Sequence, residues 1–162
     1  MSLTELPYGL PGRVFRSPMP YSAYDPSGEL VEQYREEEIS VIVLLAEEHE
    51  YRRIAQRDLK KLYTENGFQV IHLPIEDMSI PGLEALRPAV QAAYELARDG
   101  KNIAIHCHAG VGRTGMFAAC LARETLGLTG EQAISWVRER ILNAVENLEQ
   151  RDVVLNFQPE SE

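Results

Sequence analysis

Three short apolar runs alternate along the chain with longer stretches that have the periodicity of helices. The runs lie at residues 41–45, 68–73 and 103–106 and are rich in valine, isoleucine and leucine. Apolar runs of this length are typical of buried strands, and helices between successive strands are typical of parallel pairing. The pattern therefore predicts an α/β fold, with a central, mainly parallel sheet flanked by helices.

The helical stretches have recognisable ends. Gly67 and Gly100 follow two of them where helices commonly stop, and Thr129 with Gln132 fits a capping box at the start of another. Because no strand signal follows Cys107, the C-terminal third is predicted to be helical. A proline- and glycine-rich opening holds one plausible short strand, at residues 13–16. The predicted helices cover residues 28–38, 47–66, 83–98, 114–126, 131–142 and 147–157.

The composition argues against several classes of partner. With 162 residues, 44% of them hydrophobic, the chain falls within the usual size of one domain. A net charge of -9 disfavours nucleic acid and anionic membranes, so an anionic substrate must be captured by local geometry. Two cysteines are too few for a disulfide framework, and neither a leader nor a run of about 18 apolar residues is visible. We expect a cytoplasmic monomer.

The most informative stretch is residues 106–115, which lie between an apolar strand and a predicted helix. Ala109, Gly110 and Gly112 are small enough for the main chain to curl tightly around a tetrahedral anion. The amide groups of such a loop, and the positive end of the helix that follows, then converge on the anion. The segment is therefore predicted to be a phosphate-binding loop.

Three side chains of this loop could take part in a reaction at the bound anion. Cys107 would lie close to unpaired amide donors and a guanidinium, which stabilise a thiolate at neutral pH. Arg113 presents a planar fork of donors that matches two phosphate oxygens, in the bound substrate and in the transition state. The Thr114 hydroxyl could donate to the sulfur and stabilise it as a leaving group.

The loop resembles the signature of the protein tyrosine and dual-specificity phosphatases: Cys107 is followed, after five residues, by Arg113 and Thr114. The preceding His106 also fits that signature. The resemblance extends over the strand and helix order of residues 10–157 and implies one phosphatase domain across residues 1–162, without a cofactor. It implies a two-step reaction through a cysteinyl-phosphate. The phosphate would then be bound by Arg113 and by the loop residues His108, Ala109, Gly110, Val111 and Gly112.

The same resemblance implies a general acid on a separate loop and a late segment beside the site. Asp77, in a proline-containing loop after the second predicted strand, is the candidate acid, and Glu76 is the competing carboxylate. Residues 140–150 resemble the late segment, in which Gln150 could position the hydrolytic water. Asp77 could instead cap the next helix or lie in a turn.

The predicted substrates are phosphorylated proteins, with phosphotyrosine first and phosphoserine and phosphothreonine as further targets. Relatives that act on inositol phospholipids often carry lysines in the loop, where this chain has His108 and Val111. A phosphatase for phospholipids, nucleotides or other small phosphomonoesters remains an alternative. So does a module that binds phosphorylated partners with little turnover.

Other interpretations of the same residues are possible. Residues 110–115 also match the glycine pattern of dinucleotide-binding folds, but the strand that those folds require after the helix is missing. Cys107 could be an inert core cysteine, as we expect for Cys120 on an apolar helix. His49 and His72 have no companions at metal-ligand spacing, so no metal is predicted.

Overall fold

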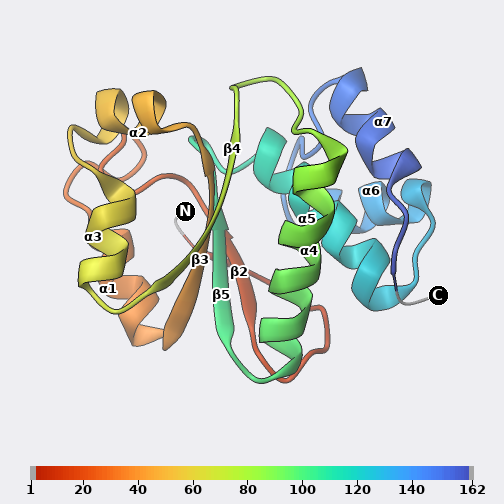
Figure 1. Cartoon of the computed structure of the whole chain (residues 1–162), viewed down its shortest axis with the longest axis horizontal. Helices are drawn as coiled ribbons and strands as arrows, with labels where there is room; N and C mark the ends of the chain where they lie inside the picture. Colours follow the sequence, from red (N-terminus) through yellow and green to blue (C-terminus); the bar gives the residue numbers. More distant parts are fainter. Residues whose placement is uncertain (1–2, 161–162) are drawn as a thin grey trace.

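A computed structural model describes residues 3–160 and contains a five-stranded sheet in the order β1-β2-β5-β3-β4. Strands β2, β5, β3 and β4 pair in parallel, and β1 adds to β2 in the antiparallel direction. The mainly parallel α/β fold is thus confirmed (Figure 1). The strands are β1 (Thr4–Leu6), β2 (Val14–Ser17), β3 (Ile39–Ala46), β4 (Gln69–Ile75) and β5 (Asn102–His106).

Helices cover both faces of the sheet. The first three helices pack on one face, and the remaining four, with the C-terminal third of the chain, lie on the other (Figure 1). The helices are α1 (Glu29–Glu36), α2 (Glu48–Ala55), α3 (Leu59–Glu65), α4 (Leu83–Arg98), α5 (Gly112–Leu126), α6 (Gly130–Arg138) and α7 (Leu148–Asn156).

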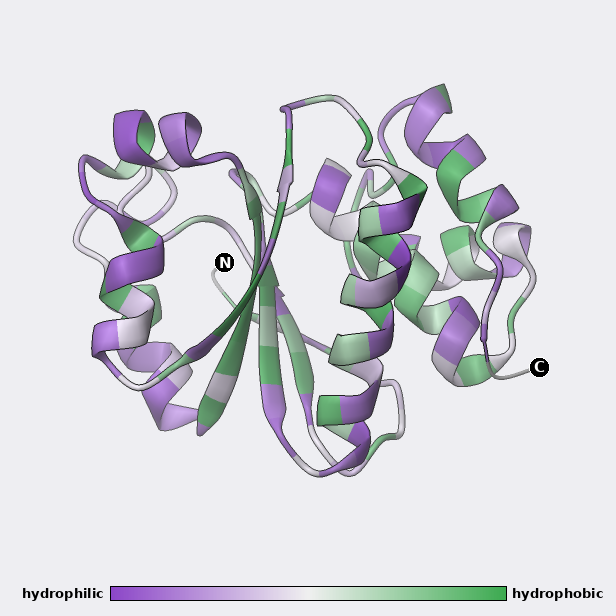
Figure 2. Ribbon diagram, in the orientation of Figure 1, coloured by the Kyte–Doolittle hydropathy of each residue, from purple (hydrophilic) through white to green (hydrophobic). Residues whose placement is uncertain are grey.

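The sheet divides the hydrophobic core into two parts, as its interior strand β3 illustrates. Alternate residues of a strand point to opposite faces, so Val43 belongs to the core cluster that includes residues of α4 and α5, while Leu44 belongs to the cluster that includes residues of α1, α2 and α3. Figure 2 shows the hydrophobic residues concentrated on the strands and on the helix faces turned toward them. Each fully buried Leu or Val side chain contributes about 1.5–3 kcal/mol, so the two-sided burial fixes the sheet between its helical layers.

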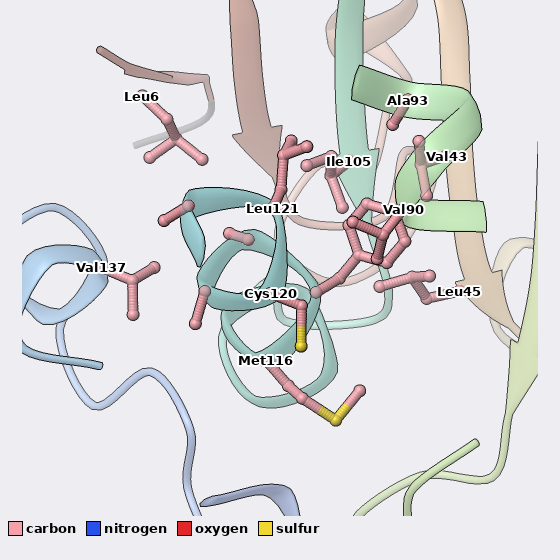
Figure 3. Packing of buried hydrophobic residues seen from close by; sticks show 14 of the residues in the cluster. Leu6, Val43, Leu45, Val90, Ala93, Ile105, Met116, Cys120, Leu121 and Val137 are labelled. Atoms are coloured by element: carbon pink, nitrogen blue, oxygen red, sulfur yellow. The ribbon is translucent and has the colours of Figure 1, made fainter. Parts of the chain in front are cut away.

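Helix α5 is the most deeply buried helix on its side of the sheet. Met116, Cys120 and Leu121 are completely inaccessible to solvent and pack among neighbouring strands and helices (Figure 3). The burial of Cys120 agrees with the packing role expected for it. Because α5 follows residues 107–111 directly, this packing anchors one end of that loop in the core.

The single helix predicted for residues 47–66 is wrong, because the chain forms two helices there. Gln56 ends α2 in the left-handed conformation, with φ at 58°. Asp58 then caps α3, and its side chain accepts a hydrogen bond from the Lys61 amide at 3.1 Å. The apolar periodicity continues across the break, and this continuity hid the turn from the sequence pattern.

Two further differences concern the ends of the chain. The helix predicted for residues 131–142 stops at Arg138, and the following turns hold Asn143 and Val145 at positive φ, 66° and 59°. The short strand β1 was not expected in the proline- and glycine-rich opening, where it pairs with β2. The capping box of Thr129 with Gln132 is present as predicted.

The topology gathers four loops at one end of the sheet, where the parallel strands have their carboxyl ends. Because β2, β5, β3 and β4 are parallel and adjacent, the loops after their carboxyl ends meet there. The loop after β2 lies on one side of the loop after β5, and the loops after β3 and β4 lie on its other side. Residues from widely separated parts of the sequence are thereby brought to one place.

Candidate active site

Cys107 lies at the floor of the loop that joins β5 to α5, and only 3% of its surface is exposed. The loop turns sharply at Gly110, where φ is +78°, a conformation that favours glycine. Gly112 is the first residue of α5, so the amino end of this helix opens onto the loop. A helix amino terminus and a tight small-residue loop together form a site for an anion.

Thr114 lies in the first turn of α5 and contacts the cysteine. Its hydroxyl Oγ1 donates a hydrogen bond to Cys107 Sγ at 3.1 Å, and Thr114 is fully buried. A hydroxyl donor of this kind stabilises negative charge on sulfur.

His106, immediately before the cysteine, is enclosed in the core. Burial lowers the pKa of His106 to about 4, against the opposing effect of the Cys107 carbonyl, so the ring is neutral near pH 7. Its Nδ1 lies 3.1 Å from the Cys107 carbonyl oxygen, and its Nε2 lies 2.7 Å from the Tyr63 hydroxyl. A neutral ring satisfies both contacts when Nδ1 donates and Nε2 accepts, which fixes the end of β5.

Arg113 is held in place by three partners. Both oxygens of Glu50 accept from its guanidinium at 2.8 Å, and the Ile75 carbonyl accepts from Nη1 at 2.8 Å. Asp77 Oδ1 lies 3.1 Å from Nη2. Burial raises the pKa of Glu50, but the hydrogen bond and charge of Arg113 outweigh it, so the net shift is downward. The pair is therefore ionised, and it orients the fork before any substrate binds.

Glu50 was missed by the sequence reasoning. It lies on α2, in the helix that follows β3, and is 4% exposed. The only signal that pointed to Glu50 was topological: it follows β3, and the carboxyl end of β3 lies beside the loop of Cys107. Its neighbours Glu47 and Glu48 made Glu50 look like one of several surface acids.

Arg16 was also missed, and it braces the loop from outside. Its guanidinium donates to the carbonyl oxygens of Ala109 and Gly110 at 2.7–3.0 Å, and the Met19 amide donates to the His108 carbonyl at 2.8 Å. These bonds hold the carbonyl side of the loop and so fix its curvature. Val111, by contrast, precedes α5 with φ at -120° and has an intermediate exposure.

The two candidate acids occupy different environments in the loop after β4. The Asp77 side chain is 61% exposed and forms the contact with Arg113 described above. Glu76 is also exposed, but among residues 3–160 the ion-pair partners of Arg113 are Glu50 and Asp77. The geometry therefore brings Asp77 to Arg113.

Gln150 is completely buried and connects two segments beside the site. Its Oε1 accepts from the Glu146 amide at 2.9 Å, and its Nε2 donates to the Ser79 carbonyl at 3.5 Å. Nearby, the Asn147 side chain donates to the Met78 carbonyl at 2.9 Å. The late segment thus holds the loop that carries Asp77, a contact that sequence reasoning had not anticipated for Gln150.

Neither a metal-binding cluster nor a membrane-spanning helix is found among residues 3–160. Across residues 3–160, no cluster of three or more histidine, cysteine or carboxylate side chains is arranged to hold a metal ion. No helix in the same range has the length and apolar character needed to cross a membrane.

Most of the chain matches the profile of one known protein family. A family profile described as "Polymorphic toxin system, DSP-PTPase phosphatase" matches residues 20–126, which include the cysteine loop and the Asp77 loop. The chain belongs to the cysteine-based dual-specificity phosphatases. The predicted membership in this family of phosphatases is thereby confirmed.

Individual relatives of this dual-specificity phosphatase agree. Mouse protein tyrosine phosphatase domain-containing protein 1 is 30% identical over 146 residues, which is 82% of this chain and 19% of that protein. The chain thus spans about a fifth of that relative. The crystal structure of Tk-PTP in the active form is 30% identical, with a TM-score of 0.77 and 93% of each chain covered. PTPMT1, solved in complex with PI(5)P, shares the fold at 21% identity and a TM-score of 0.72, covering 89% of this chain and 88% of that one.

Proposed function

We propose that the protein is a phosphatase that removes phosphate from phosphotyrosine, and from phosphoserine and phosphothreonine, through a cysteinyl-phosphate intermediate. The observation that carries the proposal is the joint placement of Cys107, Thr114, Arg113 and Asp77. The first two are linked by the 3.1 Å hydrogen bond to sulfur, and the last two by the 3.1 Å ion pair. These two contacts support a single site that combines a nucleophile, a donor to the departing sulfur, a guanidinium for the phosphate and a carboxylate.

In the first step, the Cys107 thiolate attacks phosphorus in line with the ester oxygen. The sulfur–phosphorus bond forms as the phosphorus–oxygen bond breaks, and protonated Asp77 donates its proton to the departing oxygen. Arg113 and the loop amides bind the remaining phosphate oxygens. We expect the phosphate to take over Nη2 of Arg113 from Asp77, which frees the acid for the leaving group.

In the second step, water attacks the phosphorus of the cysteinyl-phosphate. Asp77, now a carboxylate, accepts a proton from that water, and the sulfur–phosphorus bond breaks to release inorganic phosphate. The Thr114 hydroxyl stabilises the thiolate that leaves. Gln150 contributes through the loops that it holds together, and a direct contact with the water is not required of it.

An exposed aromatic side chain supports an aryl phosphate as substrate. Tyr24 is 59% exposed, and its ring meets the His108 ring edge-on with the centroids 5.6 Å apart. It belongs to the segment after β2, on the opposite side of the cysteine loop from Asp77. An aromatic wall there favours a flat, apolar leaving group, as in phosphotyrosine.

The deciding test is hydrolysis of para-nitrophenyl phosphate by the wild type and by Cys107→Ser, with chelator and reductant present. Loss of turnover in Cys107→Ser, together with a trapped phosphoenzyme in the wild type, is the expected result. Retained hydrolysis in the variant would eliminate the covalent mechanism. Phosphotyrosine and phosphoserine peptides of one sequence then give the preference, and an inert wild type would favour a phosphate-binding module.

A phospholipid phosphatase is the second candidate, and exposed apolar side chains favour it. Met78 is 55% exposed and lies beside the late segment, where Leu142 and Leu148 are 80% and 77% exposed. PTPMT1, of the same fold, was solved with PI(5)P. Against this candidate stand the acidic charge of the chain and the absence of a lysine at residues 107–113. Release of phosphate from PI(5)P vesicles, measured beside the peptides, distinguishes the two.

A further inference from the structure

The carboxylate of Glu146 packs directly against the phosphate-binding loop. A Cβ atom added to Gly112 would lie 1.9 Å from Glu146 Oε1 and 2.3 Å from its Cδ, so the carboxylate occupies the space that a side chain at residue 112 would need. Gly112 immediately precedes Arg113 and begins α5. A negative charge therefore stands at the rim of a loop built to hold an anion.

The backbone around Glu146 is strained and firmly held. Val145 has φ at +59°, a conformation that is unfavourable for a β-branched residue. Arg138 donates to the Ala144 carbonyl at 2.8 Å and to the Val145 carbonyl at 2.9 Å, while buried Gln150 accepts from the Glu146 amide at 2.9 Å. Strain of this kind persists where the surroundings impose it, and it is concentrated at functional sites. The turn that carries Glu146 is thus held in one conformation, with its carboxylate beside the loop.

Besides Arg113, two arginines lie near the rim, but both donate to backbone carbonyls, Arg16 to those of the loop and Arg138 to those of the turn before Glu146. Glu50 already neutralises Arg113, Asp77 adds a further carboxylate, and Glu146 belongs to none of the ion pairs among residues 3–160. The loop itself carries His108 and Val111 and has no lysine that could receive a second phosphate group. One phosphate can be bound by the amides and the Arg113 guanidinium, but a phosphate beside it on the Glu146 side would be repelled by the unpaired Glu146 carboxylate.

We propose that Glu146 is a specificity-determining residue that selects against substrates with a second phosphate close to the one being removed. The proposal rests on the proposed phosphatase function and narrows its substrates to singly phosphorylated sites. Glu146 acts on the charge of the substrate, and it neither forms nor breaks a bond to phosphorus. Its effect weakens as salt rises, because added ions screen an exposed carboxylate.

The test compares two peptides of one sequence, which carry either a single phosphotyrosine or the same phosphotyrosine beside a phosphoserine. We measure kcat/KM for both peptides in wild type, Glu146→Gln and Glu65→Gln. Glu65 provides the matched control, because it is an exposed acid at the end of α3. It lies shortly before the start of β4, at the end of the sheet opposite to the loop of Cys107. In Glu146→Gln the ratio of doubly to singly phosphorylated peptide is expected to rise about three- to tenfold at low salt. In Glu65→Gln it stays at the wild-type value.

The outcomes separate the two proposals. An unchanged ratio in Glu146→Gln, or an equal loss on both peptides, overturns the selection role and leaves a structural one. A rise that persists at high salt also overturns it. Glu146→Asp keeps the charge and should retain the discrimination, so it controls for damage to the strained turn, with thermal unfolding of each variant as a check. A wild type inactive on both peptides refutes the proposed function itself.

Discussion

Arg113 and Glu50 form a two-point ion pair that is enclosed in the protein, with both N–O distances at 2.8 Å and side-chain exposures of 2% and 6%. In such a pair each charge depends on the other, because water cannot replace a lost partner. The guanidinium is planar, so two contacts to one carboxylate also fix its orientation. The orientation of the Arg113 guanidinium is thus set by a residue of α2, a helix on the opposite face of the sheet from α5.

Glu50→Gln should weaken phosphate binding and lower stability. The amide offers a single acceptor oxygen and no charge, so Arg113 loses its fixed orientation. We expect KM for a phosphopeptide to rise roughly tenfold and the unfolding free energy to fall by about 3–5 kcal/mol. Steady-state kinetics and chemical denaturation measure the two effects. Glu48→Gln, on the same helix but exposed, is the control, and a similar change there would refute the assignment.

Asp77→Asn should mainly lower kcat. The amide can fill the same space but cannot donate a proton as an acid, and loss of a general acid typically reduces rates by about 10²–10⁴. The loss should be greatest for phosphoserine peptides, whose alkoxide leaves poorly, and smallest for para-nitrophenyl phosphate. Glu76→Gln should stay near the wild-type rate. If Glu76→Gln instead shows the larger loss, the acid role belongs to Glu76.

Gly110→Ala should damage the phosphate-binding loop more than conformational strain alone explains. A Cβ at Gly110 would lie 2.3 Å from the Ser17 carbonyl oxygen and 2.4 Å from Arg16 Nη2. Gly127 has a similar φ, +68°, but open space around it. Gly127→Ala should therefore cost about 1–2 kcal/mol and keep its activity. Gly110→Ala should cost more and lose vanadate binding, as isothermal titration would show. Equal behaviour of both variants would contradict the bracing role of Arg16.

Stability should fall between pH 7 and pH 4, partly because of His106. Its pKa is about 4 in the folded protein against roughly 6.5 in an unfolded chain. Between these pH values the unfolded chain binds a proton that the folded protein does not. As pH falls through this range, the free energy of unfolding therefore decreases by about 3 kcal/mol. The contribution of His106 levels off below pH 4. The lowered pKa of Glu50 acts in the same direction at more acidic pH.

Denaturation of wild type and His106→Asn at pH 7 and pH 4.5 checks this assignment. The asparagine does not titrate, so the variant should show a shallower loss of stability over that range. If the two proteins lose stability equally between these pH values, His106 is not the group responsible.

The sequence was most informative where chemistry and local structure coincide. The small residues and the spacing of Cys107, Arg113 and Thr114 identified the loop, and regular apolar periodicity predicted α4 from Leu83 to Arg98 with both ends correct. These features depend on neighbouring residues only. The turn after Gln56 escaped notice because the apolar pattern runs through it on both sides.

The residues that position the loop could not be predicted in the same way. Glu50 and Arg16 act on partners 63 and 94 positions away, through the order in which the strands pair. Nothing adjacent to either residue distinguishes it from the other charged side chains of the chain. Such supporting contacts become visible only when the strand order is known.

The bracing of the loop from distant segments also has a consequence for folding kinetics. Arg16 comes from the second strand, Glu50 from the second helix, and the contact of Asn147 with Met78 spans 69 positions. Contacts between residues far apart in sequence form late and slowly, because long loops must close first. A refolding chain should therefore recover phosphate binding in the same slow phase as its global fluorescence change. No early, locally folded intermediate would be able to bind substrate.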